Sequence, residues 1–137
     1  MTLREGLSIG ARRRLFVGGC DTVELANTYG TALYVMDEAA IRKSCRAFVR
    51  AMAEHAPEGG VYYASKALCV TAILRLVHQE GLGVDVVSGG ELQTALKAGI
   101  PMDKVMYHGN VKTAEELSMA VRLGVGGGDL RHVLRGG

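Results

Sequence analysis

Residues 61–110 read VYYASKALCVTAILRLVHQEGLGVDVVSGGELQTALKAGIPMDKVMYHGN, and this stretch decides the fold. Short apolar runs at 61–65, 83–87 and 104–108 have the length and the Val and Tyr content of buried strands. Between these runs, apolar side chains recur at helical spacing, and glycines follow where helices end in a left-handed cap. Strands and helices that alternate with short connections predict right-handed crossovers and a parallel sheet. The predicted class is therefore α/β.

The same alternation extends on both sides of this stretch. Upstream, residues 37–55 place apolar side chains at three- and four-residue steps and predict an amphipathic helix, which Pro57 and the following glycines end. Downstream, Thr113 stands three residues before Glu116, the spacing of a capping box, and opens a further helix through Leu123. The chain thus carries three or four strand-helix units.

The two ends of the chain fit the alternation less well. We expect residues 1–19 to be a mobile arm, Asp21 or Thr22 to cap a short helix that stops at Gly30, and residues 31–36 to form a strand. Residues 125–137 are rich in glycine and arginine, so an irregular tail is expected there. The expected domains are an arm at 1–19, a barrel domain at 20–124 and a tail at 125–137.

Composition excludes several classes of protein. The chain has 137 residues, 48% hydrophobic, with a formal net charge of +2, so no strong field attracts nucleic acid or an anionic membrane. No run approaches the roughly 20 apolar residues of a membrane span, and no signal peptide opens the chain. Three cysteines without metal-ligand spacing indicate reduced thiols rather than a zinc site. We expect a soluble, cytoplasmic protein.

Candidate functional residues follow the predicted strands. In a parallel α/β sheet, active groups gather at the carboxyl ends of strands, where loops vary while the sheet holds them. This rule selects residues at three strand exits: Lys66, Asp85, Glu91, His108 and Asn110.

Among these candidates, Lys66 has the position that most specifically predicts a chemical role. It directly follows five mostly apolar strand residues, where desolvation would favour the neutral amine and make it a nucleophile. The alternative is a lysine whose ammonium simply extends from the strand end into water.

Asp85 and the residues from His108 to Asn110 are more ambiguous. Asp85 alternates with Val84 and Val86, so in a barrel it faces either the lumen or the helix layer, and both positions require a partner. That partner could be purely structural, a backbone donor or a lysine. His108 and Asn110 suit contact with a planar ligand or an anion, although a histidine at a strand end can also be an ordinary satisfied polar residue.

Three motifs carry a resemblance to a known family. The segments YASKA at 63–67, DVVSGGEL at 85–92 and HGN at 108–110 resemble the successive strand-end motifs of the diaminopimelate decarboxylases, which are fold-type III enzymes that use pyridoxal phosphate (PLP). The similarity runs from about Phe16 to Gly124, in the family's order and spacing. A related ornithine or arginine decarboxylase is the alternative within the same fold type.

The resemblance implies a fold and a chemistry. It implies an alanine-racemase-like (β/α)₈ barrel followed by a β-domain, of which this chain holds the first three or four βα units. It implies that Lys66 links covalently to PLP, that Asp85 and Glu91 lie near the cofactor, and that His108 and Asn110 face the same mouth. The implied reaction removes the carboxylate at the D-centre of meso-diaminopimelate and yields L-lysine and CO₂, a step of lysine biosynthesis, in a homodimer.

The resemblance also implies what the chain lacks. The family's phosphate loop, the acidic partner of the pyridinium nitrogen and the residues that complete a neighbouring subunit's site all match positions beyond residue 137. We therefore expect a truncated form that binds PLP weakly and does not turn over by itself. The alternative is a non-catalytic fragment that at most captures PLP through Lys66 or associates with itself through an unpaired strand edge.

Overall fold

The computed structural model describes residues 6–128, and the chain divides into two compact units, Met1–Ser44 and Cys45–Gly137. The division lies inside a helix, not at residues 19 and 124 where the sequence suggested boundaries. Each unit is described by itself below. Most of the expected tail, residues 129–137, lies outside the described residues.

The first unit opens with a small antiparallel sheet, so the expectation of a mobile arm at 1–19 is wrong for residues 7–19. The strands are β1 (Leu7–Ile9), β2 (Leu15–Val17) and β3 (Cys20–Asp21), in the order β1-β2-β3. A short 3₁₀ turn, η1 (Ala11–Arg13), joins the first two. Strands of two or three residues are too short for a periodic pattern to reveal them in the sequence.

The helix after this sheet confirms the predicted cap, and the segment that follows corrects a prediction. Helix α1 (Thr22–Tyr29) begins at Asp21, whose carboxylate accepts hydrogen bonds from the N–H groups of Val23 and Glu24, and it ends at Gly30. Residues 31–36, predicted as a strand, are irregular and exposed. A strand needs a neighbour for its backbone groups, and the described residues provide none here.

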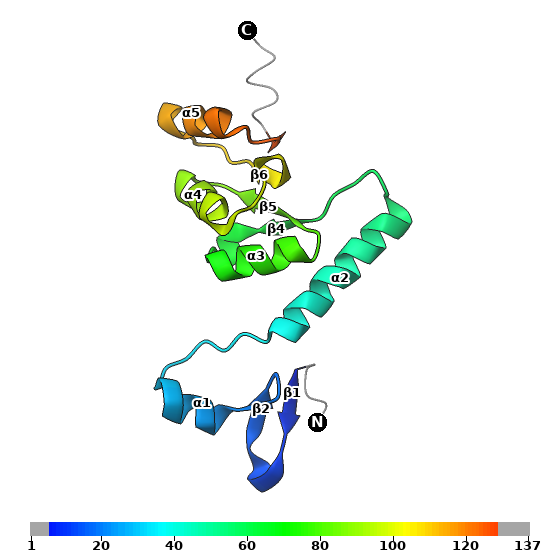
Figure 1. The fold of residues 1–137 in the computed structure, drawn as a ribbon, viewed down its shortest axis with the longest axis vertical. Helices are drawn as coiled ribbons and strands as arrows, with labels where there is room; N and C mark the ends of the chain where they lie inside the picture. The colour runs from blue at the N-terminus through cyan, green and yellow to red at the C-terminus, as the bar shows by residue number, and fades with distance from the viewer. Residues whose placement is uncertain (1–5, 129–137) are drawn as a thin grey trace. The chain divides into compact units, whose positions relative to one another are not determined.

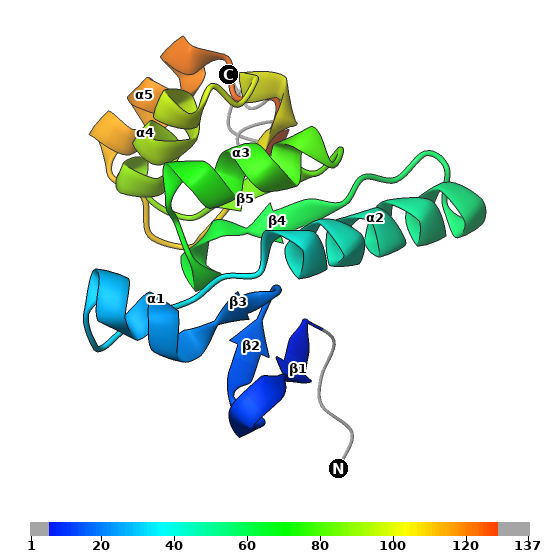
Figure 2. The same cartoon turned by 60° about the horizontal axis from the view of Figure 1, so that its bottom comes forward.

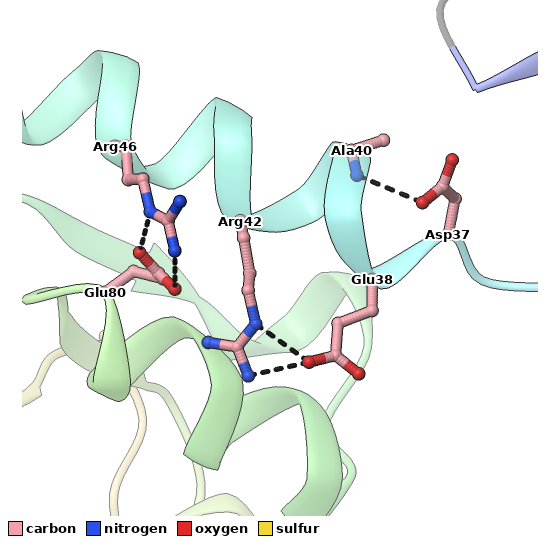
Figure 3. A network of polar contacts seen from close by, with 6 residues as sticks. All are labelled: Asp37, Glu38, Ala40, Arg42, Arg46 and Glu80. Atoms are coloured by element: carbon pink, nitrogen blue, oxygen red, sulfur yellow. Dashed lines mark hydrogen bonds and ion pairs between the residues drawn. The ribbon is translucent and has the colours of Figure 1, made fainter. Parts of the chain in front are cut away.

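Helix α2 (Glu38–His55) confirms the most regular periodicity of the sequence and crosses the boundary between the units. Asp37 accepts a hydrogen bond from the N–H of Ala40 at its start, and Glu38 pairs with Arg42 one turn later (Figure 3). In the second unit, the guanidinium of Arg46 donates two hydrogen bonds to the carboxylate of Glu80, 2.5 and 3.0 Å long (Figure 3).

A four-stranded parallel sheet organises the second unit and confirms the α/β class. Its strands lie in the order β4-β5-β6-β7, of which Figure 1 labels the first three. Their bounds are β4 (Tyr62–Ala64), β5 (Gly83–Val86), β6 (Val105–Tyr107) and β7 (Gly127–Gly128). Ala64, Asp85 and Met106 are register partners across the first three strands. Side chains alternate between the faces of a strand, so these three residues share one face.

Three helices alternate with these strands: the first two pack against the other face of the sheet at β5, and the third packs beside the second (Figure 2). They are α3 (Thr71–Gln79), α4 (Gly89–Ala98) and α5 (Ala114–Leu123). A 3₁₀ turn follows β4 (η2, Ser65–Ala67) and another precedes β6 (η3, Met102–Lys104). The core lies between helices and sheet, where eight apolar residues of the described chain are 0% exposed: Leu74, Val84, Val86, Leu92, Ala95, Val105, Tyr107 and Ala120. Successive strand-helix units with this layering are consistent with the expected partial (β/α)₈ barrel.

The caps of these helices agree with the sequence patterns. Ser88 caps α4, and Gly99 ends it in the left-handed conformation. Thr113 and Glu116 form the expected capping box of α5, and Gly124 ends that helix with a φ of +73°.

The fourth strand corrects the expectation of an irregular ending directly after Gly124. Gly127 and Gly128 of β7 pair in parallel with Met106 and Tyr107 of β6. A Cβ on Gly126 would lie 2.9 Å from the Cα of Asp103, so this close approach requires glycine. Because glycines carry no apolar side chain, the hydrophobic pattern of the sequence does not indicate this strand.

No helix among residues 6–128 is long and apolar enough to cross a membrane. The three cysteines are free thiols, and only Cys45 of these three is buried. The free thiols agree with the reduced cysteines expected from the sequence, and Cys45 packs as a small buried side chain.

Candidate functional site

Lys66 lies at the carboxyl end of β4, within η2, and this turn lies against β5. The preceding Ser65 is fully buried, whereas the Lys66 side chain is exposed. The core thus holds the backbone here while the amine reaches solvent. The expectation that apolar surroundings shield this amine is not met in the described residues.

Asp85 lies in the middle of β5, between two fully buried valines. Its side chain is 17% exposed and points to the face opposite the helices, which resolves the two orientations that the sequence left open. Its partner is neither a lysine nor a backbone donor. It is the imidazole of His108.

His108 directly follows β6 and continues its pairing with β5, because its backbone N–H donates to the carbonyl of Val86 over 3.1 Å. The ring Nδ1 lies 2.5 Å from Oδ1 of Asp85, and the imidazole remains 44% exposed. A carboxylate that holds one nitrogen of an imidazole fixes the orientation of the ring. The structure thus brings together two of the residues that the sequence singled out.

The loop after His108 is held by a residue that the sequence reading missed. Lys112 donates a hydrogen bond from Nζ to the carbonyl oxygen of Gly109 over 2.6 Å. The same ammonium lies 5.0 Å from the centroid of the Tyr107 ring, a cation–π contact. Gly109 has a φ of +124°, which an L-residue rarely adopts. Asn110 is exposed in this loop.

Glu91 holds the start of α4. Its carboxylate accepts a hydrogen bond of 2.6 Å from the N–H of Val87, and its own N–H donates to the hydroxyl of Ser88. These bonds satisfy backbone donors that a helix start leaves unpaired. Glu91 therefore shapes the loop between β5 and α4 whether or not it also contacts a ligand.

Glu116 has a role that the sequence predicted only in part. Its carboxylate accepts hydrogen bonds from the N–H of Thr113 at 2.9 Å and from the N–H of Gly89 at 2.8 Å, so it joins the first turns of α5 and α4. These backbone donors hold the pKa of Glu116 below its ordinary value. The capping box was visible in the sequence, but the bond to Gly89 depends on how the two helices pack.

The hydroxyl of Tyr107 is buried beside this carboxylate. Burial raises the pKa of Tyr107, and the negative charge of Glu116 raises it further. Both residues belong to the helix-covered side of the sheet, and the Tyr107 hydroxyl is buried there without a hydrogen-bond partner among the described residues.

The residues at the strand ends fit a carbonyl-bearing group that bonds to a lysine. Lys66 offers an exposed amine on a backbone anchored by buried Ser65. A carboxylate–imidazole pair lies on the adjacent strands. Lysine amines form such bonds when they are reachable and correctly oriented.

Comparisons with known proteins give this arrangement a family. The sequence profile of the family "Pyridoxal-dependent decarboxylase, pyridoxal binding domain" matches residues 38–132, which extends the similarity beyond the limit at Gly124 expected from the motifs. Diaminopimelate decarboxylase of Halalkalibacterium halodurans is 47% identical over 118 residues, and that of Bacillus subtilis is 46% identical over 112. These alignments cover 86% and 82% of this chain but only 27% and 26% of the relatives.

Solved structures agree with the sequence comparison. Diaminopimelate decarboxylase of M. jannaschii, in complex with L-lysine, superposes with a TM-score of 0.81 at 35% identity and covers 93% of this chain and 30% of that one. The protein AQ1208 of Aquifex aeolicus gives a TM-score of 0.80 at 34% identity, covering 96% and 32%. The chain spans about a quarter of the length of its curated relatives, and it belongs to the pyridoxal-dependent decarboxylases through their pyridoxal-binding domain.

Proposed function

We propose that this chain is part of a diaminopimelate decarboxylase, in which Lys66 binds PLP covalently and Asp85, Glu91, His108 and Asn110 line or shape the cofactor site. One observation carries the proposal: an exposed lysine at the end of β4 lies beside an Asp85–His108 pair on the neighbouring strands. Relatives at 46–47% identity that bear this activity by name support it.

The proposed reaction converts meso-diaminopimelate to L-lysine and CO₂. The cofactor, when bound, supplies the conjugated ring that accepts the electron pair left by the departing carboxylate. The residues of this chain are proposed to hold and orient the cofactor. Lys66 provides the covalent attachment, and the Asp85–His108 pair provides a fixed imidazole at the same strand ends. The complete enzyme is proposed to be a cytoplasmic homodimer with an amino-acid substrate.

The 137-residue chain alone is proposed to capture PLP without turning over substrate. It covers about a quarter of the length of its relatives, and the resemblance matches the phosphate loop and the partner of the pyridinium nitrogen to positions beyond residue 137. A module that captures PLP or associates with itself, and a related ornithine or arginine decarboxylase, are the competing functions.

Titration of the chain with PLP tests the proposal. We expect a visible absorbance band that borohydride converts into a stable adduct in the wild type and in Lys104→Ala, but not in Lys66→Ala. Lys104 is a suitable control because it is exposed and precedes β6, at the opposite end of the strand. If Lys66→Ala behaves like the wild type, the proposed attachment is wrong.

Turnover separates the remaining possibilities. We expect no CO₂ from meso-diaminopimelate, ornithine or arginine with the 137-residue chain. Release of CO₂ from meso-diaminopimelate would contradict the proposed inactivity of this chain, and release from ornithine or arginine alone would contradict the proposed substrate.

A further inference from the structure

We propose that Asp85 is a positioning residue that acts through His108. It holds the imidazole with Nδ1–H directed to the carboxylate and thereby leaves Nε2 to accept a hydrogen bond from an N–H or O–H group of a ligand held near Lys66. The inference rests on the proposed function and deepens it, because it assigns the pair one joint role.

The hydrogen-bond chemistry of the pair determines which nitrogen is protonated. An ionised carboxylate only accepts hydrogen bonds, so the ring nitrogen 2.5 Å from Oδ1 of Asp85 must carry the hydrogen. A neutral imidazole carries one hydrogen, and Nε2 is then an acceptor. Such an acceptor can take a hydrogen bond from an N–H or O–H group of a bound ligand.

The register of the sheet places this acceptor within range of a ligand on Lys66. Ala64, Asp85 and Met106 are aligned across β4, β5 and β6; Lys66 follows two residues after Ala64 in the turn η2, and His108 follows two residues after Met106, just beyond β6. Neighbouring strands are about 4.8 Å apart, so about 10 Å separate the ends of β4 and β6 that Lys66 and His108 follow. A small molecule bound to the lysine side chain can bridge that distance.

The surroundings of His108 favour a fixed ring. The backbone N–H of His108 is bonded to Val86, and the next carbonyl, that of Gly109, is bonded to Lys112. Because these hydrogen bonds hold the backbone at His108 and Gly109, the orientation of the imidazole depends on its contact with the carboxylate of Asp85. The 44% exposure of the side chain leaves space for a ligand at the other nitrogen.

The protonation state of the ring can be measured without any ligand. In the ¹⁵N-labelled 137-residue chain at pH 8, long-range ¹H–¹⁵N spectra are expected to show His108 as the Nδ1–H tautomer, with signals assigned by their loss in His108→Gln. Asp85→Ala is expected to shift the population toward Nε2–H, and the exposed Asp103→Ala is expected to have no effect. A wild-type Nε2–H tautomer, or a tautomer unchanged in a folded Asp85→Ala chain, would overturn the inference.

A double-mutant cycle on PLP capture tests whether the two residues act as one. If Asp85 acts through His108, each single variant, Asp85→Ala and His108→Gln, slows borohydride-trapped capture by about 10- to 100-fold. The double variant is then no slower than His108→Gln alone. Multiplied losses would contradict a joint role.

The two proposals fail in different ways. A wild-type chain that captures no PLP contradicts the proposed function, while the tautomer of His108 still decides the inference about Asp85. Normal capture combined with an Nε2–H tautomer leaves the proposed function intact and overturns the pairing. His78, whose Nδ1 contacts the carbonyl of Leu82, reports in the same spectra whether each variant keeps its fold.

Discussion

The two faces of the parallel sheet carry different kinds of residues on the same strands. On the helix-covered face, Val84, Val86, Val105 and Tyr107 are all completely buried. On the opposite face, Asp85, Met106 and His108 retain contact with solvent. One set of positions therefore supplies apolar burial, and the alternate set can hold a carboxylate and an imidazole without burying them in the core.

This difference shows how a short strand can serve stability and chemistry together. Burial of apolar surface stabilises the layer of helices, and each buried apolar side chain contributes about 1.5–3 kcal/mol. The same pleat directs Asp85 away from that layer, where its charge has a partner in His108. Substitutions on the two faces are consequently expected to affect different measurements.

The largest effect on stability is expected from the covered side. Leu92 of α4 is fully buried, so Leu92→Ala is expected to lower the free energy of unfolding by about 2–5 kcal/mol. Met106→Ala, on the opposite face, is expected to cost less because that side chain is only half-buried. Urea unfolding followed by circular dichroism measures both variants. Equal losses would show that the two faces are not energetically distinct.

A smaller effect is expected from acid. The pKa of Glu116 is lowered in the folded chain by the N–H groups of Thr113 and Gly89, and that of Asp21 is lowered by Arg14. The unfolded chain therefore takes up protons at these groups first, and stability falls as the pH drops below about 4–5. Urea midpoints between pH 7 and pH 3 measure the loss.

Glu116→Gln provides the control for this acid effect. The amide cannot ionise, so the variant is expected to be less stable at neutral pH and to lose less stability on acidification. A pH dependence identical to that of the wild type would show that the bonds of Glu116 to the two helix starts do not depend on its charge.

Much of this architecture could be predicted from the sequence because local signals determine it. The caps at Asp21 and Thr113 and the left-handed glycines that end α4 and α5 mark helix ends by short-range hydrogen bonds, and these occur as predicted, whereas α3 ends at Glu80 with a φ of −89°. The strand positions β4, β5 and β6 follow from short apolar runs. Their parallel arrangement follows from the alternation with helices.

The incorrect predictions concern features that depend on non-local partners. Residues 31–36 have the composition of a strand but no neighbour to pair with in the described chain, while β7 consists of glycines and pairs nonetheless. Phe48 fits the apolar periodicity of α2 but is 66% exposed, because periodicity shows which residues share a face and not what covers it.

The candidate site likewise has features that could be predicted from the sequence and features that could not. The rule on strand ends located Lys66, Asp85 and His108 individually. Their pairing could not be predicted, because the contact between Asp85 and His108 depends on the register of β5 against β6. The roles of Lys112 and Glu116 likewise depend on contacts between a loop and a strand or between two helices.

The location of the captured cofactor tests the central claim most directly. The chain is incubated with PLP, reduced with borohydride and digested, and mass spectrometry locates the modified lysine. We expect the pyridoxyl group on the peptide that contains Lys66, with little modification of the other exposed lysines. A label spread evenly over the lysines, or concentrated on another one, would contradict the assignment of the strand-end amine as the cofactor's attachment point.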